Sequence, residues 1–368
     1  MSILTKKFTQ EEYQAVYLVD EVYDGMRLDQ FIQEYLPAYS RQEIKKKIAK
    51  KEIIIHDRPG KNKPSSKLHF GEKVTVVIPK TTHEDEWWNG QKVALQTIPE
   101  IIFQDQKIVV ISKPAYMATH PTGKHLFNCA TVYFQDKENK TVHSIHRIDR
   151  ETSGVLLLGT DPKEASKLTP QFERGEVKKC YFFISVIQRG QDKEEHYHDK
   201  VEFKEEARLD SPKDGLDRVW IRHHPKDSKH GKRAETDFKI LHTEISHKNK
   251  REYALGLAFP KTGRQHQIRV HALANGLPLL GDKIYLGSFP MFQRFKEETA
   301  TEEDHQLLEL PRQALHATAL KIKYQDKLTT FKSKIPGDLK EWMSSHLSIE
   351  ISKVEEQIEA TLKCWSDD

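Results

Sequence analysis

Short apolar runs, each about as long as one β-strand, recur from residue 97 onward and limit the folds open to this chain. Apolar runs of roughly four to eight residues suit strands, whereas a buried helix needs a longer run. Helical spacing occurs between them, as in residues 265–274, which Asn275 and Gly276 close. The pattern predicts an α+β domain on a mixed, largely antiparallel sheet. The strand-like runs are residues 108–111, 155–158, 181–187 and 255–259.

Residues 20–80 have the pattern of a separate small domain, in which two helices precede a few strands. Apolar residues within 28–36 recur at helical spacing, and Pro37 ends that helix. Ser40 and Glu43 then form a capping box that begins a second helix. The sequence therefore predicts a small domain of two helices and an antiparallel sheet. Its strand-like residues are 53–55 and 74–76, separated by a turn at 58–60.

The chain thus divides by pattern into five segments. The linker has mixed charge without periodicity, which predicts a mobile tether whose Trp87 and Trp88 pack against the larger domain. A polar and basic insertion in the larger domain predicts loops with one hairpin. The segments are an N-terminal segment (1–19), the small domain (20–80), the linker (81–96), the larger domain (97–340, insertion 189–233) and a C-terminal helical extension (341–368).

Charge is nearly balanced over the whole chain, so any nucleic-acid surface must come from local clusters. The sequence has 59 Lys and Arg against 55 Asp and Glu, a formal net charge of +4. Its 3 cysteines are widely spaced, which argues against a disulfide framework and for a reducing compartment. With no signal-peptide pattern and no apolar run of membrane-spanning length, we expect a cytoplasmic protein without a membrane partner. We also expect it to be a monomer.

Residues 146–154 place one carboxylate between two guanidinium groups, directly before an apolar run. A buried strand that begins with such a charged turn favours a polar cluster facing a cleft. Arg147 and Arg150 flank Asp149 and should lower its pKa, which suits a nucleophile or base better than a general acid. Asp149 is therefore a candidate catalytic residue. The alternative is a surface turn with an Arg–Asp ion pair.

Six blocks of residues occur in the order of the motifs of one known family. They are Ser112-Lys113-Pro114 with His120-Pro121-Thr122-Gly123, His146-Arg147-Ile148-Asp149 with Thr152-Ser153-Gly154, Val177-Lys178-Lys179-Cys180-Tyr181, Thr262-Gly263-Arg264-Gln265-His266-Gln267-Ile268-Arg269-Val270-His271, Gly281-Asp282-Lys283-Ile284-Tyr285 and Leu315-His316-Ala317. Together they resemble the RluA-type pseudouridine synthases over roughly residues 97–335. A chance match of six ordered blocks is a much weaker explanation than common descent.

This resemblance implies isomerisation of uridine to pseudouridine in RNA, with Asp149 as the catalytic carboxylate. Tyr181 would lay its ring against the target base, and Arg269 would hold the Asp149 carboxylate through a two-pronged salt bridge. The alternatives from pattern alone are a core tyrosine and a solvent-facing helical arginine. The resemblance also implies substrate contacts from Arg147, His146, Arg264 and Lys113.

The small domain resembles the S4 RNA-binding domain, on the two helix starts Arg27-Leu28-Asp29 and Ser40-Arg41 and the strands that follow. The resemblance implies phosphate contacts from the basic face of its second helix, with a salt-sensitive affinity for structured RNA. Solvation is the alternative use of such a face. The implied RNA-binding residues are Arg27, Arg41, Lys45, Lys46, Lys47, Lys50 and Lys51.

Large-subunit ribosomal RNA is the first expected substrate and tRNA the second. One alternative is a non-catalytic RNA-binding or ribosome-assembly protein on the same fold. Another is a glycosidase, which would need a second carboxylic acid across the scissile bond. Metal-binding motifs, a dinucleotide-binding glycine pattern and a P-loop are absent from the sequence, so we expect neither metal nor cofactor.

Overall fold

The computed structural model describes residues 2–36, 39–56, 58, 62–80, 84–122, 125–189, 199–212 and 219–363. By contacts, the chain separates into two units. The first comprises Met1–Asp85 with Ala118–Val142, and the second Glu86–Met117 with His143–Asp368. Each unit has its own hydrophobic core.

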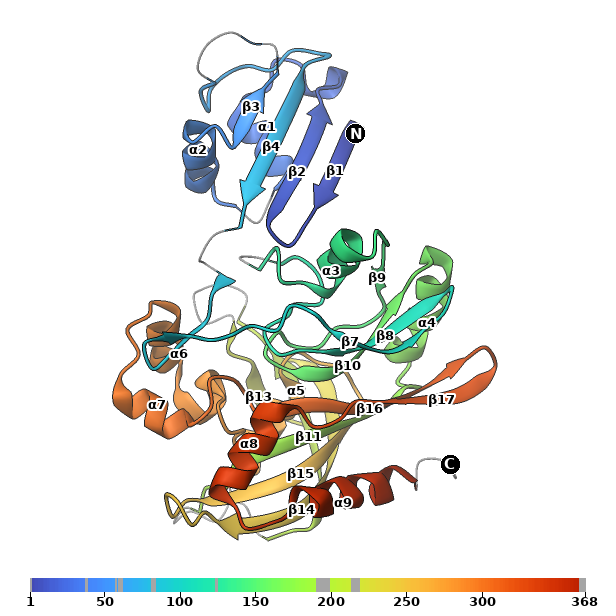
Figure 1. Cartoon of the computed structure of the whole chain (residues 1–368), viewed down its shortest axis with the longest axis vertical. Helices are drawn as coiled ribbons and strands as arrows, with labels where there is room; N and C mark the ends of the chain where they lie inside the picture. The colour runs from blue at the N-terminus through green and yellow to red at the C-terminus, as the bar shows by residue number, and fades with distance from the viewer. Residues whose placement is uncertain are drawn as a thin grey trace. The chain divides into compact units, whose positions relative to one another are not determined.

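The first unit is a four-stranded antiparallel sheet with two helices on one face (Figure 1). Alternate residues of its strands, such as Tyr13 and Tyr17 and then Val74 and Val76, are buried beneath those helices. The strand order is β1-β2-β4-β3. The elements are β1 (Ser2–Phe8), β2 (Glu12–Leu18), α1 (Leu28–Tyr35), α2 (Arg41–Ala49), β3 (Ile53–Ile55), β4 (Lys73–Pro79) and α3 (Ala130–Lys137), with a 3-10 turn at Glu21–Tyr23.

Local sequence signals predicted the two helices of this unit correctly. Ser40 caps α2 through the predicted capping box, in which Glu43 accepts a hydrogen bond from the Ser40 backbone. Ile44 and Ile48 of α2 are buried. Lys51 then turns the chain into β3 with a left-handed backbone, φ 62°. Pro37 and most of the predicted turn at 58–60 lie outside the described residues.

The predicted boundaries of this unit were wrong at both ends. The predicted N-terminal segment, residues 1–19, supplies β1 and β2, and β2 lies beside β4 inside the sheet. Residues 118–142, predicted within the larger domain, also group with the first unit. There the carboxylate of Asp136 accepts a hydrogen bond from the Gln10 backbone. These pairings join residues far apart in the chain, which local patterns do not report.

The described part of the predicted linker is ordered by contacts within each unit. Glu84 is buried in the first unit, where its carboxylate accepts backbone hydrogen bonds from residues 126–128. Trp88, in the short hairpin of β5 (Trp87–Trp88) and β6 (Gln91–Lys92), stacks on Phe295 of the second unit at 5.8 Å between ring centroids. A free tether is therefore not observed over residues 84–96, whereas residues 81–83 lie outside the described part.

The second unit is built on an 11-stranded sheet. The sheet is mixed and largely antiparallel, as the sequence predicted. All four strand-like runs are strands, namely β8, β10, β11 and β15. Its order is β13-β12-β14-β15-β11-β16-β10-β8-β7, with β17 beside β16 and β9 beside β10. The strands are β7 (Glu100–Gln104), β8 (Ile108–Lys113), β9 (His143–Ser144), β10 (Ser153–Gly159), β11 (Lys178–Val186), β12 (Glu202–Asp210), β13 (Arg222–Pro225), β14 (Lys232–Ile245), β15 (Glu252–Pro260), β16 (Leu315–Tyr324) and β17 (Lys327–Lys332).

The parallel pairing of β10 with β16 requires a glycine at position 154. Ser153 and Gly154 pair with His316 and Ala317. Gly154 has φ 108°, and a Cβ on it would collide with the backbone of Ala317. The Thr-Ser-Gly block thus brings the segment after Asp149 against β16.

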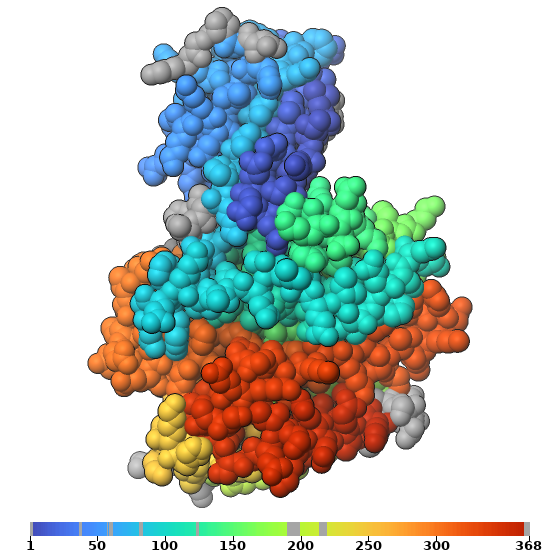
Figure 2. Space-filling view, in the orientation of Figure 1, coloured from blue at the N-terminus to red at the C-terminus, as the bar shows by residue number. Residues whose placement is uncertain are grey.

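Helices cover both faces of the central strands (Figure 1). Phe182 of β11 packs on one side with α8 and α9, while Phe183 packs on the other side with α5. In Figure 2 the C-terminal residues, coloured red, form much of the visible surface of this unit. The helices are α4 (Pro162–Glu173), α5 (Gln267–Ala274), a π-helical turn (Lys283–Gly287), α6 (Phe289–Lys296), α7 (Glu302–Leu308), α8 (Gly337–His346) and α9 (Ile351–Lys363).

Two further predictions about this unit need correction. The described part of the insertion at 189–233 contains the predicted hairpin, formed by β12 and β13, but it is more than loops, because β12 also pairs with β14 and extends the main sheet. The C-terminal extension does contain the predicted helix, but it begins earlier, with α8, and both helices bury apolar side chains in the core. Among the helices of the described residues, none is both long and apolar enough to cross a membrane.

Candidate active site

The Asp149 carboxylate lies at the centre of a cluster drawn from three parts of the second unit. Its Oδ2 is 3.3 Å from Nη1 of Arg269 on α5 and 3.5 Å from the amide nitrogen of Gln313, just before β16. Nε2 of His266 lies 3.9 Å from the same oxygen. The carboxylate keeps 29 % of its surface exposed, so a substrate can reach it.

Arg269 contacts Asp149 as expected, but its two-pronged bond is to a different carboxylate. Nε and Nη2 donate to the two oxygens of Asp282 at 2.6 and 2.8 Å, leaving only Nη1 for Asp149. The Asp282 side chain is fully buried and also caps the following helical turn through the backbone N–H groups of Ile284 and Tyr285. The predicted two-pronged Arg269–Asp149 bond is therefore wrong. Asp282 holds Arg269, and Arg269 presents one N–H to Asp149.

His266 enters the site because the chain makes a left-handed turn, φ 53°, directly before α5. Nδ1 of His266 lies 3.1 Å from the Tyr285 hydroxyl, while its Nε2 faces Asp149. The Arg269 guanidinium lies 4.9 Å from the centre of the Tyr285 ring. His266 lies between Arg264 and Arg269 in the same sequence block, yet helical spacing gave no reason to single it out.

Burial and the neighbouring groups have opposite effects on the pKa of Asp149, and the effect of the neighbouring groups is the larger. Burial favours the neutral acid, but His266, Arg269 and the Gln313 amide together lower the pKa of Asp149 below its ordinary value. Burial also lowers the pKa of His266 to about 4, so its imidazole is uncharged at neutral pH. Arg269 is thus the cation that keeps the carboxylate ionised under those conditions.

Tyr181 is half-buried on β11, directly after a bulge in its pairing with β16. Burial and then the nearby charge of Asp149 raise the pKa of its hydroxyl above the ordinary value. The hydroxyl therefore stays protonated at neutral pH and can act as a donor, whereas the ring packs against the core formed with Phe183 and Leu315.

Gln313 was not identified from the sequence, although it contacts residues at both ends of the Asp149 loop (residues 149–152). Its amide nitrogen donates to Thr152 Oγ1 at 2.9 Å as well as reaching Asp149, and its backbone N–H donates to the Glu151 carboxylate at 3.2 Å. Glu151 also accepts from Lys283 at 2.8 Å. Only Ala314 separates Gln313 from the Leu-His-Ala block. This closeness to a recognised block was the one signal in the sequence that could have pointed to Gln313.

Lys113 and His146 have structural contacts in place of the substrate contacts expected for them. The buried ammonium of Lys113 donates to the carbonyls of Pro114, Met117 and Arg150, at 2.7 to 3.1 Å. His146 stacks on Phe172, and its Nε2 accepts the Leu157 N–H at 3.0 Å. Both side chains thus hold the backbone that follows Asp149, at Arg150 and at Leu157.

Arg147 and Arg264 are exposed, as a role in substrate binding requires. Arg264 lies directly before α5, and its Nε donates to the carbonyl of Arg233 at 3.0 Å, which leaves the rest of its guanidinium group for solvent or a phosphate. Burial and the charge of Arg264 lower the pKa of Lys179 to about 8. Arg264 and Lys179 therefore lie near each other in the second unit.

The predicted RNA-binding residues of the first unit divide into two groups. The side chains of Arg41, Lys45, Lys46, Lys50 and Lys51 are exposed. Lys47 instead forms a 3.0 Å ion pair with Glu52 and lies 4.8 Å from the centre of the Tyr39 ring. Arg27 is bound by Asp29 through two hydrogen bonds of 2.9 and 2.8 Å. Lys47 and Arg27 thus already have partners within the unit.

Comparison with known proteins identifies the family. The profile of the RNA pseudouridylate synthase family matches residues 107–274. An RNA pseudouridine synthase of Aquifex aeolicus, itself described as uncharacterized, is 30% identical over 70% of this chain and 76% of its own length. This chain belongs to the RNA pseudouridine synthases. The resemblance of its six blocks to the RluA type is thereby confirmed.

Several relatives of this synthase align with most of its chain. Proteins named ribosomal large subunit pseudouridine synthase D from Yersinia pestis and Pseudomonas aeruginosa are 28% and 27% identical, covering 85% and 88% of the chain and 87% and 92% of their own lengths. A solved structure titled Human RNA Pseudouridylate Synthase Domain Containing 1 has a TM-score of 0.54 at 16% identity, over 73% of this chain and 98% of that one. That likeness confirms the fold alone.

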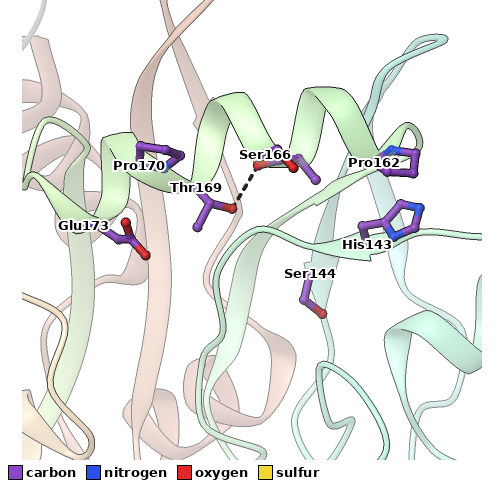
Figure 3. Close-up of a pocket in the computed structure, with 8 residues that line it drawn as sticks. His143, Ser144, Pro162, Ser166, Thr169, Pro170 and Glu173 are labelled. Atoms are coloured by element: carbon purple, nitrogen blue, oxygen red, sulfur yellow. Dashed lines mark hydrogen bonds between the residues drawn. The ribbon is translucent and has the colours of Figure 1, made fainter.

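A surface pocket of about 480 Å³ lies along α4 of the synthase (Figure 3). None of the residues that line it belongs to the Asp149 cluster. Among the described residues, no group of three His, Cys, Asp or Glu side chains could hold a metal ion. The lining residues are His143, Ser144, Pro162, Ala165, Ser166, Thr169, Pro170 and Glu173.

The buried histidines of the second unit should make its stability strongly pH-dependent. Burial lowers the pKa of His316 and of His146 to about 3. Because these values lie below the unfolded value near 6.5, the stabilisation is complete above about pH 6.5 and is lost as pH falls toward the folded values. As the pH falls below about 6.5, each such histidine should lower the free energy of unfolding by up to about 1.4 kcal/mol per pH unit.

His316→Asn tests this expectation. The slope of unfolding free energy between pH 6 and 4 should become shallower, whatever the stability of the variant at pH 7. Urea unfolding followed by tryptophan fluorescence suits the measurement, because the tryptophans among the described residues, Trp87, Trp88, Trp220 and Trp342, belong to the second unit. Ser153→Ala is the matched control, because it removes the 2.9 Å partner of His316 but keeps the titrating ring. Equal slopes for His316→Asn and the wild type would contradict the expectation.

Proposed function

We propose that Asp149 is the catalytic carboxylate, with Tyr181 and Arg269 acting beside it. The observation that carries this proposal is the accessible, ionised Asp149 held by Arg269 and Gln313. Pseudouridine formation breaks the N1–C1′ glycosidic bond and rejoins the base through C5. It needs an ionised carboxylate, a surface for the detached base and a proton donor or acceptor near that base. Tyr181 offers both ring and hydroxyl.

Glycoside hydrolysis is a poorer fit to the same cluster. It would need a second carboxylic acid that stays protonated across the scissile bond. Glu151 is the nearest carboxylate along the chain to Asp149, but its oxygens accept from Lys283 and Gln313. Burial alone would raise the pKa of Glu151, yet Lys283 and Arg150 lower it below its ordinary value. Glu151 is therefore ionised and serves to hold the loop.

We propose that the substrate is large-subunit ribosomal RNA and that the enzyme acts on it in the cytoplasm. Relatives named for that substrate align with 81 to 88% of this chain, beyond the residues that the family profile matches. Pseudouridine mapping of total RNA from cells with and without the gene tests the proposal. Sites lost from large-subunit ribosomal RNA would support it, and losses confined to tRNA would replace it with the tRNA alternative.

The exposed cations of α2, together with Lys50 at its C-cap, are proposed to bring the enzyme to structured RNA, as in the S4 domain that the first unit resembles. Lys45→Glu, Lys46→Glu and Lys50→Glu together should weaken binding to a long folded RNA. The dependence of log affinity on log salt should become shallower by about 0.7 to 0.9 per lost phosphate contact. Turnover of a short, unstructured RNA at high concentration should persist, because the Asp149 cluster belongs to the other unit.

Lys47→Gln is the matched control on the same helix. It removes one positive charge from the Lys47–Glu52 ion pair, so it should affect folding of the first unit and leave the salt slope unchanged. Titrations at several salt concentrations, followed by fluorescence anisotropy, measure both effects. If the triple variant kept the wild-type slope, the lysines would be a solvated face, and the cations at 219–235 would be the next RNA-binding candidates.

A further inference from the structure

One fully buried arginine connects the Asp149 loop (residues 149–152) to the C-terminal helices. The Arg312 side chain is 1 % exposed. Its Nε and Nη2 donate to the carboxylate of Asp338 at 2.6 and 3.0 Å. Its Nη1 donates to the carbonyl of Glu151 at 3.3 Å and to that of Gln313 at 3.1 Å. A single guanidinium thus joins the loop after Asp149, the segment before β16 and the start of α8.

The groups that Arg312 holds are those that place Asp149. Glu151 lies two residues after Asp149, and its carbonyl fixes the path of that loop. Gln313 is the next residue after Arg312, and its side chain reaches Asp149 at 3.5 Å and Thr152 at 2.9 Å. A shift of Arg312 would therefore move both the loop and the amide that contact the Asp149 carboxylate.

Asp338 is in the first turn of α8, on an element that packing holds firmly. Leu339, Trp342 and Met343 of the same helix are buried in the main core. An acidic residue is also favoured at a helix N-terminus by the helix dipole. Rigid support of this kind is what a catalytic group needs from the residues behind it. Asp338 also lies outside residues 107–274, the region that the family profile matches.

We propose that Asp338 is a positioning residue for catalysis, which holds Arg312 so that the Glu151 carbonyl and Gln313 keep Asp149 in its working orientation. The inference rests on the proposed catalytic role of Asp149. It gives the C-terminal helices a function in the reaction beyond covering the sheet.

Asp338→Asn tests the proposal in the full-length protein. It should lower kcat by about 10- to 100-fold, with KM within about threefold of wild type, because misplacement of a catalytic group by a fraction of an ångström affects the reaction more than binding. The acid limb of the kcat profile should also move to higher pH. Neighbours, the Gln313 amide among them, lower the pKa of Asp149, so loosening Gln313 must raise it.

Two further variants separate positioning from stability. Asp338→Asn leaves Arg312 buried without its counter-charge, so the double variant Arg312→Met with Asp338→Asn should be more stable than the single variant. The kcat of the double variant should remain low, because it lacks the hydrogen bond from Arg312 to the Glu151 carbonyl. Glu355→Gln is the control, since it breaks the 2.6 Å ion pair between Glu355 and Lys340 that joins α8 to α9. Its kcat and pH profile should match wild type.

Tritium release from total RNA that carries 5-tritiated uridine, isolated from cells without the gene, provides the assay whichever RNA is the substrate. The wild-type kcat and acid limb in Asp338→Asn, or a wild-type kcat in the stabilised double variant, would overturn the positioning role. Asp149→Asn is run in parallel. Full activity of Asp149→Asn would overturn the proposed site itself and the positioning role with it, whereas loss of activity there with normal Asp338→Asn would overturn the positioning role alone.

Discussion

Asp149→Asn should reduce turnover on the order of 10⁴-fold, the scale of loss found when a catalytic carboxylate or nucleophile is removed. The amide keeps the shape of the side chain and can still contact Gln313, but it can neither carry the negative charge nor accept a proton as a base. RNA affinity should stay near that of the wild type. The exposed lysines of α2 belong to the other unit, and the backbone around Asp149 is held by Lys113 and Arg312.

Tritium release from 5-tritiated uridine in RNA measures the turnover of Asp149→Asn, and anisotropy measures its binding. Glu355→Gln is the control here as well, because it also converts a carboxylate to an amide, but on α9 and outside the Asp149 cluster. It should leave turnover unchanged. Turnover of Asp149→Asn within about tenfold of the wild type would remove Asp149 from the catalytic role.

Arg269→Lys should lower both turnover, by about 10²-fold, and stability, by about 3–5 kcal/mol. An ammonium cannot make the two parallel hydrogen bonds that Arg269 donates to Asp282 while also reaching Asp149. The fully buried Asp282 carboxylate would then lose part of the hydrogen bonding that offsets the free-energy cost of its burial. Asp282→Asn should give a similar loss although it does not touch Asp149, and the double variant should lose far less than the sum of the two.

Arg294→Lys is the matched control for this pair. Arg294 also donates two hydrogen bonds to one aspartate, Asp304, but it does so away from the Asp149 cluster. Its substitution should affect stability and leave kcat per folded enzyme unchanged. Urea unfolding and single-turnover kinetics measure the two quantities. If Asp282→Asn were as active as the wild type, Asp282 would have no part in presenting Arg269, and the geometry of the cluster would need another explanation.

The sequence by itself determined the local elements and the residue types of the site. Capping of α2 by Ser40 and Glu43, the strand β10 after Asp149 and the end of α5 at Asn275 all follow from interactions within a few residues of one another. Such short-range signals survive in a sequence because the interacting groups keep a fixed spacing along the chain. The ordered blocks likewise indicated the family, which the comparisons confirmed.

Only the tertiary structure decided which groups meet. Arg269 pairs through two hydrogen bonds with Asp282, 13 residues away, and through one with Asp149, 120 residues away. Gln313 reaches Asp149 across 164 residues. The sequence carried no spacing for such contacts, because they form only when β10, β16 and α5 pack together in the second unit. For the same reason, β2 and residues 118–142 joined the first unit against the predicted boundaries, since strand pairing and core packing act between distant segments.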